Sequence, residues 1–175
     1  MRICSLLLRL AALDLVLLCM LPETAAASLQ WSWRYEGAGI SARGTLTTSD
    51  VANSSGYFQI TGITGTRNGI TITGLQPAGT AIPGNEPYAV DNLISSKGQQ
   101  LTGNGFGFAL ADGTFSNPFF AHNHTPPAYL EFFSAPRSGH GNHSELAVHF
   151  VARIMQPVRE KQTGSVPHAL KRARL

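Results

Sequence analysis

Three aromatic residues near the start of the chain have a spacing that would let them bind a sugar. Trp31, Trp33 and Tyr35 stand two residues apart, so on a β-strand their side chains all point to the same face. Exposed on that face, the rings would form a platform that stacks against a carbohydrate. Buried, they would fill the core of a β-sheet protein, since aromatic side chains bury large areas. The sequence favours burial, with the sugar platform as the alternative.

Histidines form two short groups whose imidazoles are chemically suited to zinc or copper. His122 and His124 would point the same way on a strand, and His140 and His143 lie in a glycine-rich segment. A metal site needs three or four converging ligands, and these groups occur in Pro-rich or Gly-rich stretches where solvated polar residues are expected. We therefore predict solvated histidines rather than a metal site.

Oxygen-bearing side chains offer a second kind of site. Glu86, Asp91, Asn92 and Asp112 carry the oxygen ligands that calcium prefers, but they lack the dense acidic spacing of a calcium loop. Hydrogen bonds within turns account for the same residues, so no cofactor is predicted and calcium is the alternative. Asp91, Asp112 and His122 are also the residues of a hydrolase hypothesis, although the chain has no Gly-x-Ser-x-Gly motif.

The elements that must position these residues are β-strands, and the strongest local signal is a hairpin. Alternating apolar runs flank Asn68-Gly69, a pair that accepts the positive φ angles of a type I′ turn. Gly62 interrupts the alternation of the first run, which predicts a β-bulge. After the second run comes a Pro- and Gly-rich loop, and its segment 83–87 is the best place to look for function.

Short alternating runs continue along the chain at roughly ten-residue intervals, joined by Gly, Pro and Asn turns. Extended runs are expected at residues 88–94 and 101–110, and no stretch after residue 27 has a sustained helical period. The pattern predicts an all-β protein of about eight to ten antiparallel strands. We expect a β-sandwich, with jelly-roll and immunoglobulin-like topologies both open, and a β-barrel as the alternative.

The chain divides into three parts. Residues 1–27 have a basic start, an apolar run and a small-residue cleavage pattern, which predict a signal peptide cut between Ala27 and Ser28. A single β domain is predicted over residues 28–154. Residues 155–175 are predicted to be a disordered basic tail, because they cannot bury enough apolar surface to offset the entropy of ordering.

Charge and cysteine are also unevenly distributed along the chain. Residues 28–152 hold five basic and seven acidic side chains, a net charge of −2, whereas residues 153–175 hold six basic and one acidic, a net charge of +5. The formal charge of +3 therefore comes from residues 153–175, and the β domain gives no indication of nucleic-acid binding. Cleavage would remove both cysteines, Cys4 and Cys19. Membrane contact is expected only through an uncleaved signal segment.

Five segments of the β domain carry a family resemblance. They are WSWRYEGAGISARGTLTTSD, GYFQITGITGTRNGITITGL, PAGTAIPGNEPYAVDNLI, LTGNGFGFALADGTFSNPFF and YLEFFS. In combination they resemble a group of uncharacterised bacterial exported proteins that carry a PEP-CTERM sorting tail. The resemblance implies export to the cell surface or extracellular space, with the periplasm as the alternative, and a place alongside exopolysaccharide. It brings no catalytic residues.

The end of this chain departs from the group's pattern. After Ile154 a basic end is present, but the Pro-Glu-Pro sequence and the apolar span of the group are missing. A frameshift or a truncation in the gene would explain the difference.

Three hypotheses of function follow. The first is a non-catalytic exported bacterial protein of the cell surface or biofilm matrix, with extracellular polysaccharide as its partner. The second is a carbohydrate-binding module, and the third is a secreted hydrolase. The sequence favours a protein without enzymatic activity.

Overall fold

The computed structural model describes residues 27–37, 39–135 and 142–155 of the chain. Within these ranges the regular structure consists of strands without helices. The strands are β1 (Ser28–Gly37), β2 (Ile40–Ser49), β3 (Phe58–Arg67), β4 (Ile70–Leu75), β5 (Leu93–Ile94), β6 (Phe108–Leu110), β7 (Phe115–Ala121), β8 (Ala128–Ala135) and β9 (Asn142–Ile154). The all-β prediction is confirmed for this part of the chain.

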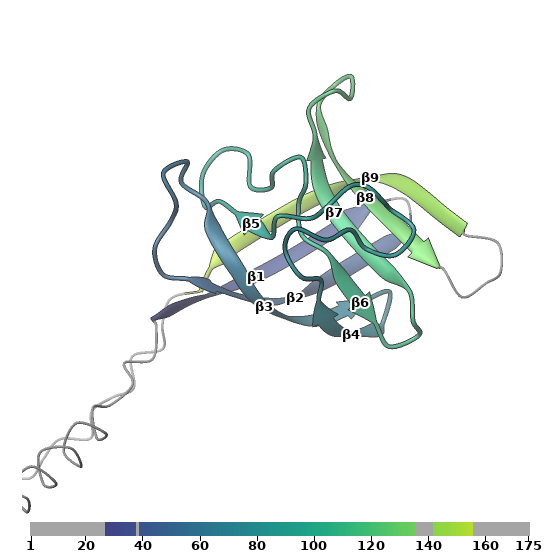
Figure 1. The fold of residues 1–175 in the computed structure, drawn as a ribbon, viewed down its shortest axis with the longest axis horizontal. Helices are drawn as coiled ribbons and strands as arrows, with labels where there is room; N and C mark the ends of the chain where they lie inside the picture. Colours follow the sequence, from purple (N-terminus) through teal and green to yellow (C-terminus); the bar gives the residue numbers. More distant parts are fainter. Residues whose placement is uncertain (1–26, 38, 136–141, 156–175) are drawn as a thin grey trace, which may run out of the picture.

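The strands form a closed antiparallel barrel (Figure 1). Eight strands follow one another in the order β2-β1-β9-β8-β7-β6-β4-β3, and β3 pairs again with β2. The short β5 pairs with one end of β3. The expected sandwich is therefore wrong and the alternative, a barrel, is observed. The pairing of β2 with β3 joins the two edges that an open sheet would leave unpaired.

The predicted hairpin is confirmed. β3 ends at Arg67 and β4 begins at Ile70, and the turn residues Asn68 and Gly69 have φ angles of 48° and 82°. The side-chain oxygen of Asn68 accepts a hydrogen bond from the backbone N–H of Ser41 at 2.7 Å. This bond holds the turn of the hairpin against the start of β2.

A β-bulge lies on β3 at the predicted place. Thr47 pairs with Gly62, whereas the next residue, Thr48, pairs with Ile60, so β3 carries one extra residue. An extra residue bends its strand and increases the local twist. The bulge therefore helps the sheet to curve into a barrel.

Aromatic side chains fill the barrel interior. Trp31, Trp33 and Tyr35 on β1 are 0%, 2% and 0% exposed. The Trp33 ring stacks on Tyr35, with 5.7 Å between centroids, and meets the edge of Phe106 at the same distance. Their predicted burial is confirmed, and the alternative of a sugar platform on β1 is wrong because no ring of the three faces solvent.

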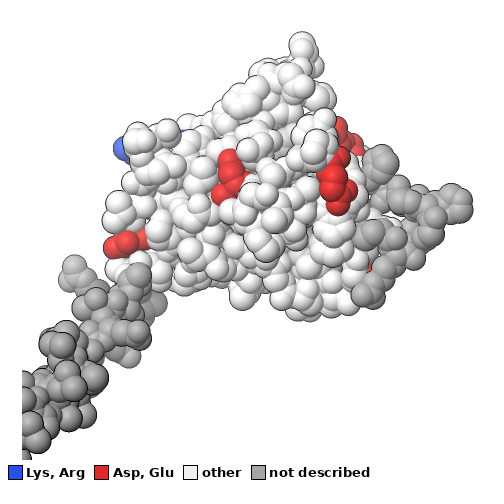
Figure 2. All heavy atoms as spheres, in the orientation of Figure 1, with Lys and Arg blue, Asp and Glu red and all other residues white. Residues whose placement is uncertain are grey.

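Charge is not evenly spread over the outside of the barrel. The face displayed in Figure 2 carries several acidic side chains and almost no basic ones.

The predicted signal peptide lies outside the described residues except for Ala27, and so does the predicted tail beyond residue 155. Within the described ranges, no helix has the length and apolarity needed to cross a membrane.

Candidate functional site

A cluster of four polar side chains lies among the aromatic residues of the barrel interior. The guanidinium of Arg67, at the end of β3, donates to both carboxylate oxygens of Glu131 on β8, with distances of 2.7 Å from Nε to Oε1 and 2.8 Å from Nη2 to Oε2. Tyr35 donates to Oε1 of Glu131 at 2.5 Å, and Ser116 also donates to that oxygen. Glu131 is fully buried. We call these four residues the core ion-pair cluster.

Burial and the ion pair determine the protonation states of Tyr35 and Arg67. Burial raises the pKa of Tyr35, and the negative charge of Glu131 raises it further. Burial alone would lower the pKa of Arg67, but the hydrogen bonds and the charge of Glu131 outweigh it and the pKa is raised. Tyr35 therefore remains a neutral donor and Arg67 remains a cation.

The same contacts make the cluster a structural element. The Glu131 carboxylate accepts hydrogen bonds from three side chains, and the guanidinium of Arg67 also lies over the ring of Phe133, 4.0 Å from its centroid. A buried ion pair is tolerated when hydrogen bonds satisfy its remaining polar atoms, as they do here. The cluster links β1, β3, β7 and β8 through the centre of the barrel. Its polar groups already bond to one another, so its role is structural.

A groove of about 520 Å³ lies beside the hairpin formed by β7 and β8, which projects beyond the rest of the barrel (Figure 1). Its lining combines aromatic rings, side-chain amides and imidazoles. The residues are Asn85, Tyr88, Gly103, Asn104, Asn117, Phe119, Phe120, Ala121, His122, Asn123, His124, Leu130 and Glu145. We call it the hairpin groove.

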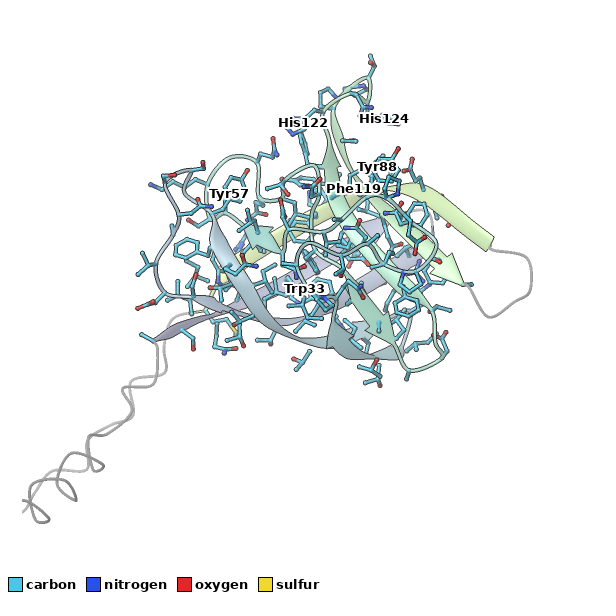
Figure 3. All side chains as sticks on the ribbon, viewed as in Figure 1. Trp33, Tyr57, Tyr88, Phe119, His122 and His124 are labelled. Carbon is cyan, nitrogen blue, oxygen red and sulfur yellow. The ribbon has the colours of Figure 1, made fainter. Side chains whose placement is uncertain are left out.

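Two kinds of ring reach the hairpin groove. Tyr88 is 70% exposed, so its ring is accessible to a ligand from solvent. Figure 3 shows Tyr88 and Phe119 near the base of the projecting hairpin, with His122 and His124 farther along it. His122 is itself held in place, because its ring packs edge-on against Phe120 with 5.0 Å between centroids.

Side-chain amides fix the loops that border the groove. The amide nitrogen of Asn117, on β7, donates to the backbone oxygens of Asn104 and Phe106, each at 3.1 Å. Its amide oxygen accepts a hydrogen bond from the side chain of Asn85 at 3.3 Å. Asn117 thus joins two loops to the barrel wall, so the groove is preformed.

The carboxylates proposed from the sequence do not gather in one place. Each accepts hydrogen bonds from nearby loop residues. The donors are Gly84 for Glu86, Leu93 and Thr102 for Asp91, and Thr114 for Asp112. Of the three residues in the hydrolase hypothesis, His122 lines the hairpin groove, whereas Asp91 and Asp112 do not. The structure therefore does not assemble those three side chains around this groove.

Metal ligands are also dispersed. His122 and His124 both line the groove, yet the described part of the chain contains no group of three or more His, Cys, Asp or Glu side chains that could hold a metal ion. His140 and the side chain of His143 lie outside the described residues. Asn92 is buried and uses its amide to bind two backbone groups. The prediction of no cofactor stays a prediction, and calcium stays its alternative.

The sequence predicted part of the groove. The sequence indicates His122, His124 and the loop at 83–87 as candidates, whereas it predicts Tyr88 only as part of the extended run 88–94 and does not indicate Phe119. A usable signal exists at Tyr88, because it directly follows Pro87 at the end of a turn-rich segment, where a buried strand aromatic is not expected.

No protein-family model, no curated protein and no solved structure matches the chain. The function must therefore be inferred from the chemistry of these sites.

Proposed function

We propose that the protein is an exported, non-catalytic carbohydrate-binding β-barrel of the bacterial cell surface or extracellular matrix, with the hairpin groove as its sugar site. The observation that carries the proposal is Tyr88, which is 70% exposed at a groove lined by amides and imidazoles. The sugar is expected to be a neutral segment of an extracellular polysaccharide.

The chemistry of the groove suits a sugar. A pyranose ring presents a C–H face that packs on an aromatic ring, and its hydroxyls both donate and accept hydrogen bonds. Tyr88 and Phe119 supply rings, and the side-chain amides of Asn85, Asn104 and Asn123 offer donors and acceptors together. A volume of about 520 Å³ lies within the usual range of ligand pockets.

The number of carboxylates in the groove favours sugar binding over sugar hydrolysis as its function. Glycoside hydrolysis commonly uses two carboxyl groups facing each other across the scissile bond. Among the described residues that line the groove, Glu145 alone carries a carboxylate. The hydrolase hypothesis consequently has less support than the binding hypothesis.

Export rests on the sequence. The signal-peptide pattern of residues 1–27 and the resemblance to PEP-CTERM proteins both favour it. Expression of the full chain in a Gram-negative bacterium, followed by N-terminal sequencing of the protein from the medium and the periplasm, should give a chain that begins at Ser28. Recovery of an uncleaved chain in the cytoplasm would refute export.

The groove is tested by a glycan array of neutral polysaccharides, followed by calorimetry with any glycan that binds. Tyr88→Ala should weaken that binding about tenfold, the equivalent of losing one ring contact. Val51→Ala is the matched control, because Val51 is 73% exposed and does not line the groove. Absence of neutral-glycan binding, or equal affinity for wild type and Tyr88→Ala, would refute the proposal.

A further inference from the structure

Three exposed arginines lie side by side on the outer surface of the barrel. Arg34 on β1 is directly opposite Arg43 on β2, and on its other side Arg34 faces Val151 of β9, two residues from Arg153. Side chains two residues apart on a strand share a face, so all three guanidinium groups belong to one surface. We call Arg34, Arg43 and Arg153 the arginine stripe.

The three positive charges of the stripe destabilise the folded state, and no acidic side chain of the described residues forms a salt bridge with them. Like charges directly opposite each other on neighbouring strands are destabilising, and Arg34 and Arg43 are such a pair. Glu36 lies on the same face, two residues from Arg34 on β1, but it forms no salt bridge with the stripe. The salt bridge found among the described residues joins Arg67 to Glu131. Repelling cations that lack an internal partner point to an external anion.

The stripe also has the shape of a binding surface. The three arginines line a depression of about 750 Å³ over β1, β2, β3 and β9. Three hydroxyl-bearing residues also line it: Ser32 lies opposite both Thr45 and Arg153, and Thr66 lies opposite Arg43. Guanidinium groups bind carboxylates through two parallel hydrogen bonds, and hydroxyls add single hydrogen bonds beside them.

We infer that the arginine stripe binds an acidic polysaccharide, one whose carboxylate groups recur along a hydroxyl-rich chain. Single-stranded nucleic acid fits less well, because it needs aromatic rings on which bases stack, and the one aromatic residue at this depression, Trp33, has its side chain in the core. A membrane surface fits less well too, since Val151 is the one large apolar residue there with an outward side chain.

This inference goes beyond the proposed function. The stripe and the hairpin groove share no residue, and they differ in charge and in chemistry. A protein with both sites would hold a neutral and an acidic glycan at once, which would cross-link two kinds of polysaccharide.

The test uses the full chain and sodium polygalacturonate as the probe. Because the tail is itself basic, all variants carry glutamine in place of its five basic residues, so that the tail does not mask the stripe. Those residues are Arg159, Lys161, Lys171, Arg172 and Arg174. On this background, replacing Arg34, Arg43 and Arg153 by glutamine should weaken binding about tenfold and flatten its dependence on salt.

Two controls make the outcome decisive. Lys97→Gln removes one exposed cation away from the stripe and should leave affinity unchanged. Replacing the three arginines by lysine keeps the charge but loses the paired hydrogen bonds, so the affinity of the lysine variant should fall between those of the background protein and the glutamine variant. Near-ultraviolet circular dichroism verifies that each variant is folded.

Equal affinity of the glutamine variant and the background protein would overturn the inference. Tighter binding of a single-stranded oligonucleotide, or of vesicles rich in phosphatidylglycerol, than of polygalacturonate would overturn the assignment to an acidic polysaccharide. Absence of neutral-glycan binding by the wild-type protein would refute the hairpin groove and leave the stripe unaffected, so the two proposals fail separately.

Discussion

Gly44 on β2 and Gly65 on β3 lie directly opposite each other, at the pair of strands that closes the barrel. A Cβ atom on Gly44 would overlap the backbone oxygen of Thr64, and one on Gly65 would overlap the backbone oxygen of Arg43. Gly65 also has a φ angle of 142°. The two backbones approach more closely than any residue with a side chain allows, so this glycine pair shapes the seam of the barrel.

Substitution of Gly44 or Gly65 by alanine should destabilise the protein more than the same substitution at Gly74. Gly44→Ala and Gly65→Ala are each expected to lower the free energy of unfolding by about 1–3 kcal/mol, because backbone atoms must move to admit the methyl group. Gly74→Ala is the matched control, since a Cβ there meets nothing within 4 Å. Urea denaturation followed by tryptophan fluorescence measures all three. Midpoints at Gly44→Ala and Gly65→Ala equal to that at Gly74→Ala would contradict this account of the seam.

Removing only the negative charge of the core ion-pair cluster should strongly lower the free energy of unfolding. Glu131→Gln leaves the cation of Arg67 buried without its counter-charge and is expected to cost about 3–5 kcal/mol. The double variant Arg67→Met, Glu131→Leu removes both charges and should be more stable than Glu131→Gln. Glu36→Gln, at an exposed position, should change stability by less than about 0.5 kcal/mol. A double variant no more stable than Glu131→Gln would show that the pair is not the source of the cost.

Two aspartates should give opposite dependences of stability on pH. Burial raises the pKa of Asp91 and outweighs its hydrogen bonds from Thr102 and Leu93. A raised pKa in the folded state means that its stabilising contribution is full below the unfolded pKa, near 3.9, and is lost as pH rises through the folded value. Asp91→Asn should therefore become more stable relative to wild type as pH rises from about 3 to about 7.

Asp112 is the contrasting case. The hydrogen bond from Thr114 lowers the pKa of this exposed carboxyl group. Its contribution is present above the unfolded pKa and is lost as pH falls through the folded value, so Asp112→Asn should lose stability relative to wild type as pH rises. Thermal unfolding of both variants across the same pH series measures the two differences. Parallel curves for the two variants would be inconsistent with these environments.

The stability cost of a substitution at Gly69, in the turn between β3 and β4, should depend only on how well the new residue tolerates a positive φ angle. Gly69 has a φ angle of 82° and a Cβ there would meet nothing within 4 Å, so any cost of a side chain comes from the backbone conformation. Gly69→Ala is expected to cost about 1 kcal/mol, and Gly69→Asn less, because asparagine tolerates positive φ better. Denaturation midpoints rank the two variants, and the reverse order would contradict the turn assignment.

Local features of this fold could be predicted from the sequence. The turn at Asn68-Gly69 depends on two adjacent residues, and the burial of Trp31, Trp33 and Tyr35 follows from alternation within one strand. The barrel could not be predicted in the same way, because its closure depends on the pairing of β2 with β3 and on the bends that bring the first and last strands of the sheet together.

Features that join distant segments were missed. The core ion-pair cluster connects Tyr35 with Glu131, which are far apart in the chain, and no local pattern relates them. Glu131 stands inside the apolar run 129–133, and a carboxylate there is itself a sign of a buried partner. The extended runs expected at 88–94 and 101–110 are largely loops, with strands only at 93–94 and 108–110, because glycine and asparagine contacts at Gly105 and Asn92 replace strand pairing.

Closure of the barrel also bears on how the protein would behave in a crowded matrix. Each of the eight barrel strands has a neighbour on both sides within the described residues, and the remaining strand, β5, is two residues long. Aggregation of β-proteins commonly begins when an exposed strand edge pairs with another chain. With its own edges joined, this domain offers little such template, so it is suited to persist at high local concentration without forming intermolecular sheets.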